Sequence, residues 1–304
     1  MNKPKLNQLE MLVAVADTGS FGAAAAELAC TQSRISHAIT ELEACLGARL
    51  LTRSRTGCAP TEAGQRVLAK ARQMLRLAAG LAEAADVGAG LVGRVRIACF
   101  RSVATHVLPQ ALAALAVEYP GIRVDIDDSC EERQQVARAV ADGRAEIGIG
   151  QLPVAADLLV RNYVADSYVL VVPAWFAARA PLSWDQLKDL PYIQLDCSGA
   201  LAVLAQCRAA GFAAEPSRTL ATDSAVAAMV GLGLAYSILP RLAVFPEPQG
   251  VRVVDLPIAA KRQFALLALP GTARLEAVDI VLRYVGNKRI VGDSPAFRAG
   301  LLAW

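Results

Sequence analysis

The stretch AVADTGSFGAAAAELACTQSRISHAITELEACLGARLL, from Ala14 to Leu51, decides the fold of the N-terminal part of the chain. Apolar residues from Leu6 to Ala16 recur with the 3.6-residue period of an amphipathic helix. Gly19 ends that helix, and Ser20 and Thr31 each stand where an N-cap would start the next one. The stretch therefore predicts three short helices separated by tight turns.

The third of these helices has two different faces. Apolar residues between Ile35 and Leu46 lie on one face, and Gly47 closes the helix. The opposite face presents short hydroxyls, an amide, an imidazole and a guanidinium, which are groups that reach base edges in the major groove of DNA. These residues are Gln32, Ser33, Arg34, Ser36, His37 and Thr40. The pattern predicts a helix-turn-helix, although a merely solvated polar face would carry similar residues.

Two short strands, near residues 50–52 and 58–60, follow the third helix. Arg53 and Arg55 lie on the tip between them, where the wing of a winged helix-turn-helix contacts phosphate. Over the whole chain, 31 lysines and arginines stand against 28 acids, and this formal charge of +3 is too small to imply a nucleic-acid partner. The local arrangement therefore carries the prediction that residues 1–60 bind double-stranded DNA.

The N-terminal part of the chain resembles the LysR-type transcriptional regulators in a dense, in-register pattern. The matching residues are Ala14-Val15-Ala16-Asp17-Thr18-Gly19-Ser20-Phe21, Ala24-Ala25, Leu28, Gln32-Ser33, Ser36, Leu42-Glu43, Leu46-Gly47, Leu50-Leu51, Arg53 and Thr61-Glu62-Ala63-Gly64. The chain departs from the usual pattern at Arg34, Leu51 and Pro60. The resemblance implies a winged helix-turn-helix, a linker helix, and an effector-binding domain of two α/β subdomains like a type II periplasmic binding protein. It also implies a dimer of dimers.

Length and composition are those of a soluble globular protein of two or three domains, because 304 residues exceed a single domain and 55% of them are hydrophobic. The mean hydropathy is +0.38. The longest uncharged apolar stretch, residues 224–240, contains two glycines and a proline and is too short to span a membrane. Glu10 and Asp17 interrupt any signal-peptide core, so a cytoplasmic location is expected.

A further helix is predicted from the N-cap Thr61 to about Val87. Its apolar positions repeat at spacings of 4 and 3 residues, as in a coiled-coil seam: Val67, Ala71, Met74, Ala78, Leu81 and Ala85. With the resemblance, this seam predicts that residues 61–90 form a linker that joins chains into a homodimer or homotetramer. The alternative is a helix that packs on its own chain. Gly88, Gly90 and Gly93 mark a hinge after it.

Strand and helix patterns alternate beyond the hinge, which predicts an α/β effector-binding domain over residues 91–304. The pattern divides into subdomain I, about residues 91–164 and 265–304, and subdomain II, about residues 165–264. Parallel strands are expected in both, and two chain crossings make them a hinged pair. Together with the N-terminal part, the fold class is a multidomain α+β protein.

The cleft between the subdomains is the predicted effector site, because ligands of open parallel sheets bind beyond the carboxyl ends of the strands, near helix N-termini. Polar groups follow strands or open helices there: Arg101, Ser102, Thr105, Ser129, Gln151, Ser198 and Thr222. The resemblance adds that Ser102 and Ser129 occupy positions where the family commonly contacts its effector. Free N–H groups and Arg101 favour a small organic anion. Each serine or threonine alone is equally well explained as a plain N-cap.

Three alternatives stay open. Cys197 and Cys207, ten residues apart, are reminiscent of peroxide-sensing members of the family, so that cysteine oxidation would be the trigger. Cys99 with His106 is the nearest approach to the nucleophile and base of an enzyme. A solute-binding protein would explain the C-terminal half but not residues 1–60. The seven cysteines contain no C-x-x-C pair, and neither a metal site nor a cofactor is predicted.

Overall fold

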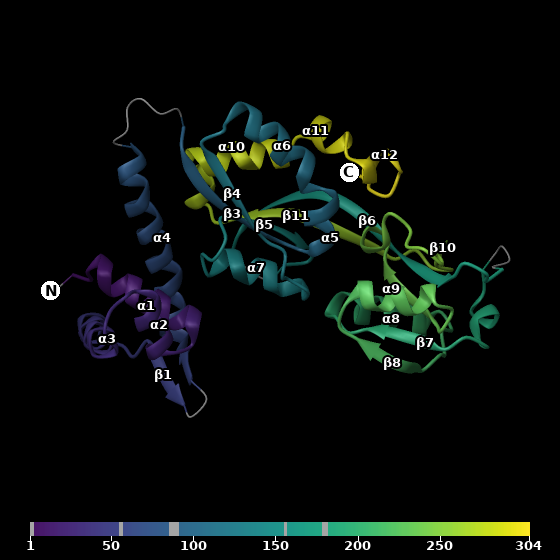
Figure 1. Cartoon of the computed structure of the whole chain (residues 1–304), viewed down its shortest axis with the longest axis horizontal. Helices are drawn as coiled ribbons and strands as arrows, with labels where there is room; N and C mark the ends of the chain where they lie inside the picture. The colour runs from purple at the N-terminus through teal and green to yellow at the C-terminus, as the bar shows by residue number, and fades with distance from the viewer. Residues whose placement is uncertain (1–2, 55–56, 85–90, 155–156, 178–181) are drawn as a thin grey trace.

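A computed structural model describes residues 3–54, 57–84, 91–154, 157–177 and 182–304 of the chain. It has three parts: a small N-terminal domain of helices with a β-hairpin, a long helix that rises from it, and a larger domain built on one sheet (Figure 1). Arg55, the seam residue Ala85 and the predicted hinge glycines Gly88 and Gly90 lie outside the described residues.

The N-terminal domain consists of three helices and a hairpin: α1 (Leu6–Thr18), α2 (Phe21–Glu27), α3 (Gln32–Leu46), β1 (Leu51–Ser54) and β2 (Gly57–Pro60). The hydroxyls of Ser20 and Thr31 each accept a backbone N–H of the following helix, at 3.4 and 3.3 Å. Gly19 and Gly47, with φ of 66° and 65°, end α1 and α3 in the left-handed conformation that favours glycine. All four caps lie where the sequence predicts them.

The three helices pack their apolar faces into one core, whose fully buried members include Leu12, Val15, Ile35, Leu42 and Leu50. The long helix α4 (Glu62–Ala84) completes this core with Leu68 and Ala71. At its start, the Oγ1 of Thr61 accepts the N–H of Gly64 at 2.9 Å. A Cβ on Gly64 would lie 2.0 Å from the carbonyl oxygen of Leu50, so no side chain fits there. The hairpin and α4 are therefore held as one unit.

The described residues of the C-terminal domain form a nine-stranded sheet in the order β4-β3-β5-β11-β6-β9-β7-β8, with β10 paired to β6. The strands are β3 (Gly93–Cys99), β4 (Ile122–Asp127), β5 (Ile147–Gln151), β6 (Leu159–Pro173), β7 (Tyr192–Leu195), β8 (Pro216–Leu220), β9 (Tyr236–Pro240), β10 (Val251–Asp255) and β11 (Lys261–Ala268). The helices are α5 (Arg101–His106), α6 (Leu108–Glu118), α7 (Arg133–Ala141), α8 (Ser198–Ala209), α9 (Asp223–Gly231), α10 (Glu276–Val285), α11 (Lys288–Gly292) and α12 (Pro295–Arg298).

The sheet is mixed, so the expectation of parallel strands is only partly right. Strands β3, β4 and β5 are parallel to one another, and so are β7, β8 and β9. Strand β6 carries the chain into subdomain II and β11 carries it back, so these two run in opposite directions and pair antiparallel with each other. Strands β8 and β10 were not expected from the sequence. The residues of β8 are mostly exposed, which leaves no apolar run to indicate a strand.

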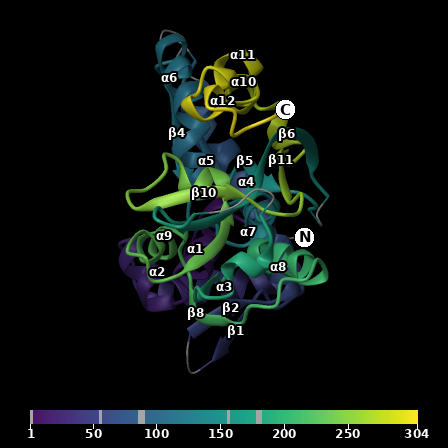
Figure 2. The ribbon, with the colours of Figure 1, turned by 90° about the vertical axis from the view of Figure 1, so that its right-hand side faces the viewer.

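The hydrophobic core changes where β6 and β11 cross between the subdomains. Val164 on β6 and Phe264 on β11 belong to the core of subdomain I. From Tyr168 onward, alternate residues of β6 enter two clusters of subdomain II, one on each face of the sheet. In subdomain I, α6 and α10 pack together on one face and α7 lies on the other. Figure 2 shows α10, α11 and α12 gathered at the top of this subdomain.

In the part of the chain that the structure describes, no single helix is long and apolar enough to cross a membrane. Helices α1 and α2 meet that requirement only together, as a pair bent by 119°. The same residues contain no group of three His, Cys, Asp or Glu side chains placed to hold a metal ion.

Candidate functional sites: a DNA-facing helix and an inter-subdomain cleft

The polar face of α3 lies on the outside of the N-terminal domain. Ile35 and Ala38 on its opposite face are buried. Of the six predicted residues on the polar face, Ser36 is half-buried and five are exposed: Gln32, Ser33, Arg34, His37 and Thr40. One rigid helix thus presents all six together, as contact with base edges requires.

Arg53 joins the hairpin to α3. Its Nη2 donates to the Oγ of Ser36 at 3.1 Å, and its guanidinium lies 4.1 Å from the centroid of the Phe21 ring. Arg34 forms no ion pair with any described residue, so its charge is available to a ligand. Arg53 therefore has a positioning role within the domain that the sequence did not indicate, whereas Arg34 is the freer cation of this surface.

Glu43 fixes the start of the hairpin. Its Oε1 accepts the buried N–H groups of Leu50 and Leu51, at 2.7 and 3.3 Å. In the sequence, Glu43 appeared only as part of the family pattern. Its bonds go to backbone N–H groups seven and eight residues later, and no sequence motif marks such a contact. This contact holds the wing at a set angle to α3.

A cleft opens between the two subdomains. Of the seven residues predicted for it, four line it: Arg101, Ser102, Gln151 and Thr222. The cleft is narrow: the space in which the centre of a water molecule fits is about 70 Å³. The two subdomains lie close together here, because Glu132 of one and Ser198 of the other are in direct hydrogen-bond contact.

Of the other three predicted residues, Thr105 and Ser129 make local contacts. The Oγ1 of Thr105 donates to the carbonyl of Arg101 at 2.9 Å, one turn back along α5. The Oγ of Ser129 donates to the carboxylate of Asp127 at 2.5 Å. Ser198 opens α8, and its polar groups contact α7 across the cleft, as described below. Thr222, which lines the cleft, also caps α9 through Ala225.

Arg133 is the cleft residue that the sequence did not single out. It is the first residue of α7 and lines the cleft. Its Nε is buried without a hydrogen-bond partner, and its guanidinium forms no ion pair with a described residue. The residue as a whole is half-buried, but an Nε donor that is buried without a partner costs free energy, so it points to a ligand that supplies the missing acceptor. Arg101, by comparison, is exposed and lies 3.9 Å from a carboxylate oxygen of Glu131.

Arg262 also lines the cleft, but its charge is already balanced. Its Nε and Nη2 donate to the two carboxylate oxygens of Asp166 at 2.7 and 2.6 Å. Burial is the largest single influence and would lower the pKa of Arg262, but the charge and hydrogen bonds of Asp166, with smaller effects of Tyr168 and Cys197, together raise the pKa. The guanidinium also lies between the rings of Tyr168 and Phe264. Arg262 therefore serves as part of the cleft wall.

Helices α7 and α8 meet across the cleft with their N-terminal ends. The N–H of Ser198 donates to the carboxylate oxygens of Glu132, at 3.2 and 3.1 Å. In return, the Oγ of Ser198 accepts the N–H of Arg133 at 3.2 Å. Since Glu132 belongs to subdomain I and Ser198 to subdomain II, these bonds hold the cleft closed. The N-terminus of α8, expected to serve a ligand, already binds a carboxylate of the protein itself.

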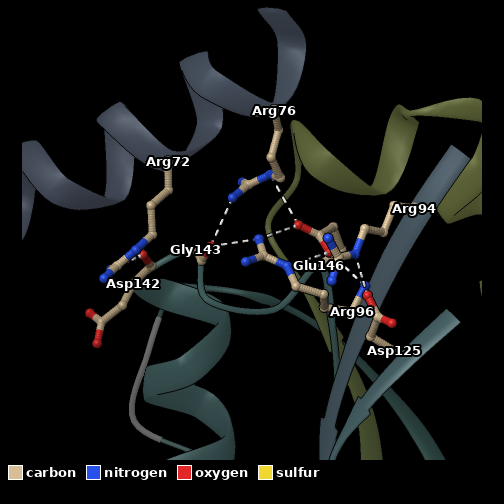
Figure 3. A network of polar contacts seen from close by, with 8 residues as sticks. All are labelled: Arg72, Arg76, Arg94, Arg96, Asp125, Asp142, Gly143 and Glu146. Carbon is tan, nitrogen blue, oxygen red and sulfur yellow. Dashed lines mark hydrogen bonds and ion pairs between the residues drawn. The ribbon is translucent and has the colours of Figure 1, made fainter. Parts of the chain in front are cut away.

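The far end of α7 contacts α4 (Figure 3). Arg72 donates to the carbonyl of Asp142 at 2.9 Å and forms an ion pair with Asp17 of α1. Arg76 donates to the carbonyl of Gly143 at 2.8 Å, and its Nε lies 3.0 Å from the Oε1 of Glu146. Burial lowers the pKa of Arg76, while the charge of Glu146 raises it. These contacts connect the C-terminal domain to both α4 and the N-terminal domain.

The three cysteines singled out in the sequence, Cys99, Cys197 and Cys207, are poor candidates for reactive thiols. Burial raises the pKa of Cys99 to about 12 and that of Cys207 to about 11. Burial also raises the pKa of Cys197, although the N–H of Ala200 opposes this effect. Cys197 precedes α8 and Cys207 lies in its last turns, so the two are about 15 Å apart along the helix axis at about 1.5 Å per residue. A disulfide between them would require α8 to unwind.

Two known protein families match this chain. Residues 6–65 match "Bacterial regulatory helix-turn-helix protein, lysR family", and residues 88–288 match "LysR substrate binding domain". The chain is 36% identical over 276 residues to a probable HTH-type transcriptional regulator, LrrA, of Synechococcus elongatus, which covers 90% of this chain and 93% of that protein. It is also 31% identical over 252 residues to a probable hydrogen peroxide-inducible genes activator of Streptomyces viridosporus, over 81% of this chain and 80% of the relative.

Solved structures share the fold. A full-length OxyR variant from Pseudomonas aeruginosa superposes with a TM-score of 0.67, over 94% of this chain and 98% of that one, at 21% identity. At that identity the likeness concerns the arrangement of the chain and not the ligand or trigger. The order of N-terminal domain, long helix and two-part C-terminal domain is therefore common to both proteins.

Proposed function

Because the chain belongs to the LysR family of DNA-binding transcriptional regulators, we propose that its cleft binds a small organic anion and that this binding controls its action on DNA. Arg133 carries the proposal, because its buried Nε has no partner in a cleft that already holds hydroxyl and amide groups. Ser102 and Gln151 line the same cleft, and no described residue forms a hydrogen bond with the side chain of either. Together they would surround a carboxylate with one cation and neutral donors.

The charges of the cleft limit the size and charge of this anion. Asp128, Glu131 and Asp223 also line it. Their carboxylates would repel a ligand with several negative groups, whereas a single carboxylate can reach Arg133 without facing all three. We therefore expect a small monocarboxylate in preference to a polyanion such as citrate.

A thermal-shift screen tests the class of ligand. Purified full-length protein would be heated with a panel of small monocarboxylates, each paired with its neutral amide or its amine. A ligand that binds the folded state raises the midpoint in proportion to the logarithm of its concentration over its Kd. The proposal requires at least one carboxylate to do so where its amide does not. A panel in which neutral or cationic members alone stabilise the protein would refute it.

Contact with DNA is assigned to the exposed face of α3 and to the wing. We propose that Gln32, Ser33, Arg34, Ser36, His37 and Thr40 read base edges, and that Arg53 and Arg55 contact the backbone. The support is the common exposure of the α3 face and the free charge of Arg34. A DNA partner also supports a cytoplasmic location. A regulatory, non-enzymatic role is supported by the burial of the candidate nucleophile Cys99.

Oligomer formation is assigned to the outer half of α4. Of the predicted seam, Ala71 is buried within the chain's own N-terminal domain, whereas Met74 and Leu81 are 46% and 72% exposed. Leu77, between them, is 50% exposed. A contiguous apolar stripe of this kind is expected to bury itself against a second copy. The inner part of the seam, at Ala71, thus packs on the chain's own N-terminal domain, and the outer part is assigned to contact with a second copy.

The oxidation alternative has less support. The relative from Streptomyces viridosporus is named for induction by hydrogen peroxide, but the two thiols of this chain are separated by the length of α8 and burial raises the pKa of both. Thiolate, not thiol, is the form that attacks peroxide. We therefore place the small anion ahead of oxidation as the trigger.

A further inference from the structure

Helix α7 spans the distance between the effector cleft and the long helix α4. It begins at Arg133 in the cleft and ends at Ala141, next to the carbonyls that α4 binds. Its nine residues correspond to a rod about 13 Å long. Each end is held by a different part of the molecule, and both sets of contacts cross a domain or subdomain boundary.

At the cleft end, the contacts of α7 depend on closure. The carboxylate of Glu132 and the N–H of Ser198 can be 3.1 to 3.2 Å apart only while the subdomains stand close together. The contact is favourable because a carboxylate at a helix N-terminus meets free N–H groups and a partial positive charge. Arg133, the next residue, holds its Nε in the same cleft without a partner. An anion that binds Arg133 would bring a second negative charge close to Glu132.

At the other end, the contacts of α7 depend on how the C-terminal domain sits on α4. Two guanidiniums of α4, Arg72 and Arg76, reach the carbonyls of Asp142 and Gly143, as Figure 3 shows. Cations next to the last carbonyls of a helix complement its partial negative charge. Arg72 also forms an ion pair with Asp17 of α1, so it joins α7 to the DNA-binding domain through one side chain.

The position of Gly143 suits this close approach. Its φ is +67°, in the left-handed region, and a Cβ there would lie 3.2 Å from the Nη1 of Arg76. A larger residue would be strained and would crowd the guanidinium. Gly143 ends α7 as a left-handed glycine commonly ends a helix, and it also leaves room for the guanidinium of Arg76.

We propose that α7 is a coupling element in which Glu132 is an internal anion that holds the cleft closed in the absence of ligand. This inference rests on the proposed function of the cleft. The effector, drawn to Arg133, displaces the carboxylate of Glu132 from α8. Helix α7 then shifts, and its C-terminal contacts with Arg72 and Arg76 change. Coupling between two sites is reciprocal, so disturbance of the Arg72 end also weakens the Glu132 contact.

Hydrogen exchange on the full-length protein without any effector tests the coupling from both ends. Glu132→Ala should speed amide exchange several-fold in the first turn of α8, and also at the distant contact of α4 with α1. Arg72→Met should speed exchange at α4 and also in the first turn of α8. The second substitution leaves no buried charge unpaired, because Asp17 is half exposed and Glu146 keeps Arg76 and Arg96 as partners.

Two matched variants serve as controls. Glu131→Ala removes the neighbouring carboxylate, which does not contact α8, and Arg66→Met removes a guanidinium of α4 whose ion pair with Glu62 stays on the same helix. Both should change exchange only locally. If Glu132→Ala and Arg72→Met also act only within about one turn of the substitution, or if the effect travels in one direction alone, α7 is not a coupling element. Since no ligand is present, this result is independent of whether the effector is an anion.

Discussion

Arg262 on β11 and Asp166 on β6 lie directly opposite each other as a buried ion pair, at the point where both strands cross between the subdomains. The side chains are 5% and 0% exposed, with both carboxylate oxygens bound to the guanidinium. Asp166 also accepts the N–H of Leu242 at 3.2 Å. Two antiparallel strands connect the subdomains here, so this pair fixes the pivot about which the cleft would open and close.

The first prediction concerns this pivot. Arg262→Met leaves the carboxylate of Asp166 buried without its cation, and should lower the free energy of unfolding by about 3 to 5 kcal/mol. Urea denaturation of the C-terminal domain, followed by circular dichroism, measures the change. The paired substitution Arg262→Met with Asp166→Asn should recover much of the loss, because no buried charge remains. A loss below about 1 kcal/mol in the single variant would show that the pair is not an essential part of the fold.

The second prediction concerns DNA readout. Arg34→Ala should cost about 1 to 3 kcal/mol at one base pair of the operator and relax the preference there. Arg55→Ala should instead weaken binding to all sequences alike and lower the salt dependence by about one unit of slope, because one phosphate contact is lost. Binding to a footprinted site and its single-base variants, at two salt concentrations, separates these effects. Equal weakening at every sequence by both substitutions would make Arg34 a phosphate contact.

The third prediction concerns the outer half of α4. Leu81→Asp places a charge in the proposed contact with a second copy, so it should dissociate the oligomer and abolish binding to a two-half-site operator. Analytical ultracentrifugation measures the mass. Val117→Asp, on α6, changes an apolar residue that is even more exposed but does not belong to α4, and should leave the mass unchanged. An unaltered mass for Leu81→Asp would remove α4 from the interface.

The fourth prediction concerns the thiols. Peroxide treatment should leave DNA binding of the unmodified protein unchanged, since burial raises the pKa of Cys197 and of Cys207 and keeps both as thiols at neutral pH. Mass spectrometry of the treated protein would report whether either sulfur is oxidised. The Cys197→Ser variant, tested in parallel, shows whether any response passes through that residue. A change in DNA affinity that this variant loses would establish the oxidation trigger instead.

The N-terminal domain could be predicted almost completely, because its signals are local. Ser20, Thr31, Gly19 and Gly47 each act within a few residues of their own position, and the apolar period of α3 fixes which face is exposed. Strands such as β4 and β7 could be predicted for the same reason, since alternation of apolar and charged residues marks β4 and a short, mostly apolar run marks β7. The support of the wing by Glu43 could not be predicted, because it depends on two backbone N–H groups rather than on a side-chain pattern.

The cleft could be predicted less well, because its residues come together only through the tertiary fold. Ser198 reads as an ordinary helix start, and its partner Glu132 is 66 residues away in the other subdomain. Arg133 follows two glutamates in the sequence and reads as one more charge on an exposed helix. Its isolation from acidic partners becomes visible when the distances are known. The antiparallel direction of β6 and β11 was likewise hidden, since the crossing depends on which strands pair.

Calorimetric titration of an anionic effector from the screen tests the central claim most directly. Arg133→Met should lower the affinity of the protein for this effector about 10- to 150-fold. This range corresponds to the loss of a hydrogen bond to a charged group, about 1.5 to 3 kcal/mol. Ser102→Ala should cost about 0.5 to 1.5 kcal/mol. Arg101→Met, which removes a cation at the rim of the same cleft, should have a smaller effect, and DNA affinity without effector should barely change. An effector that is neutral or cationic, or one whose affinity is the same in the Arg133→Met protein, would contradict the account.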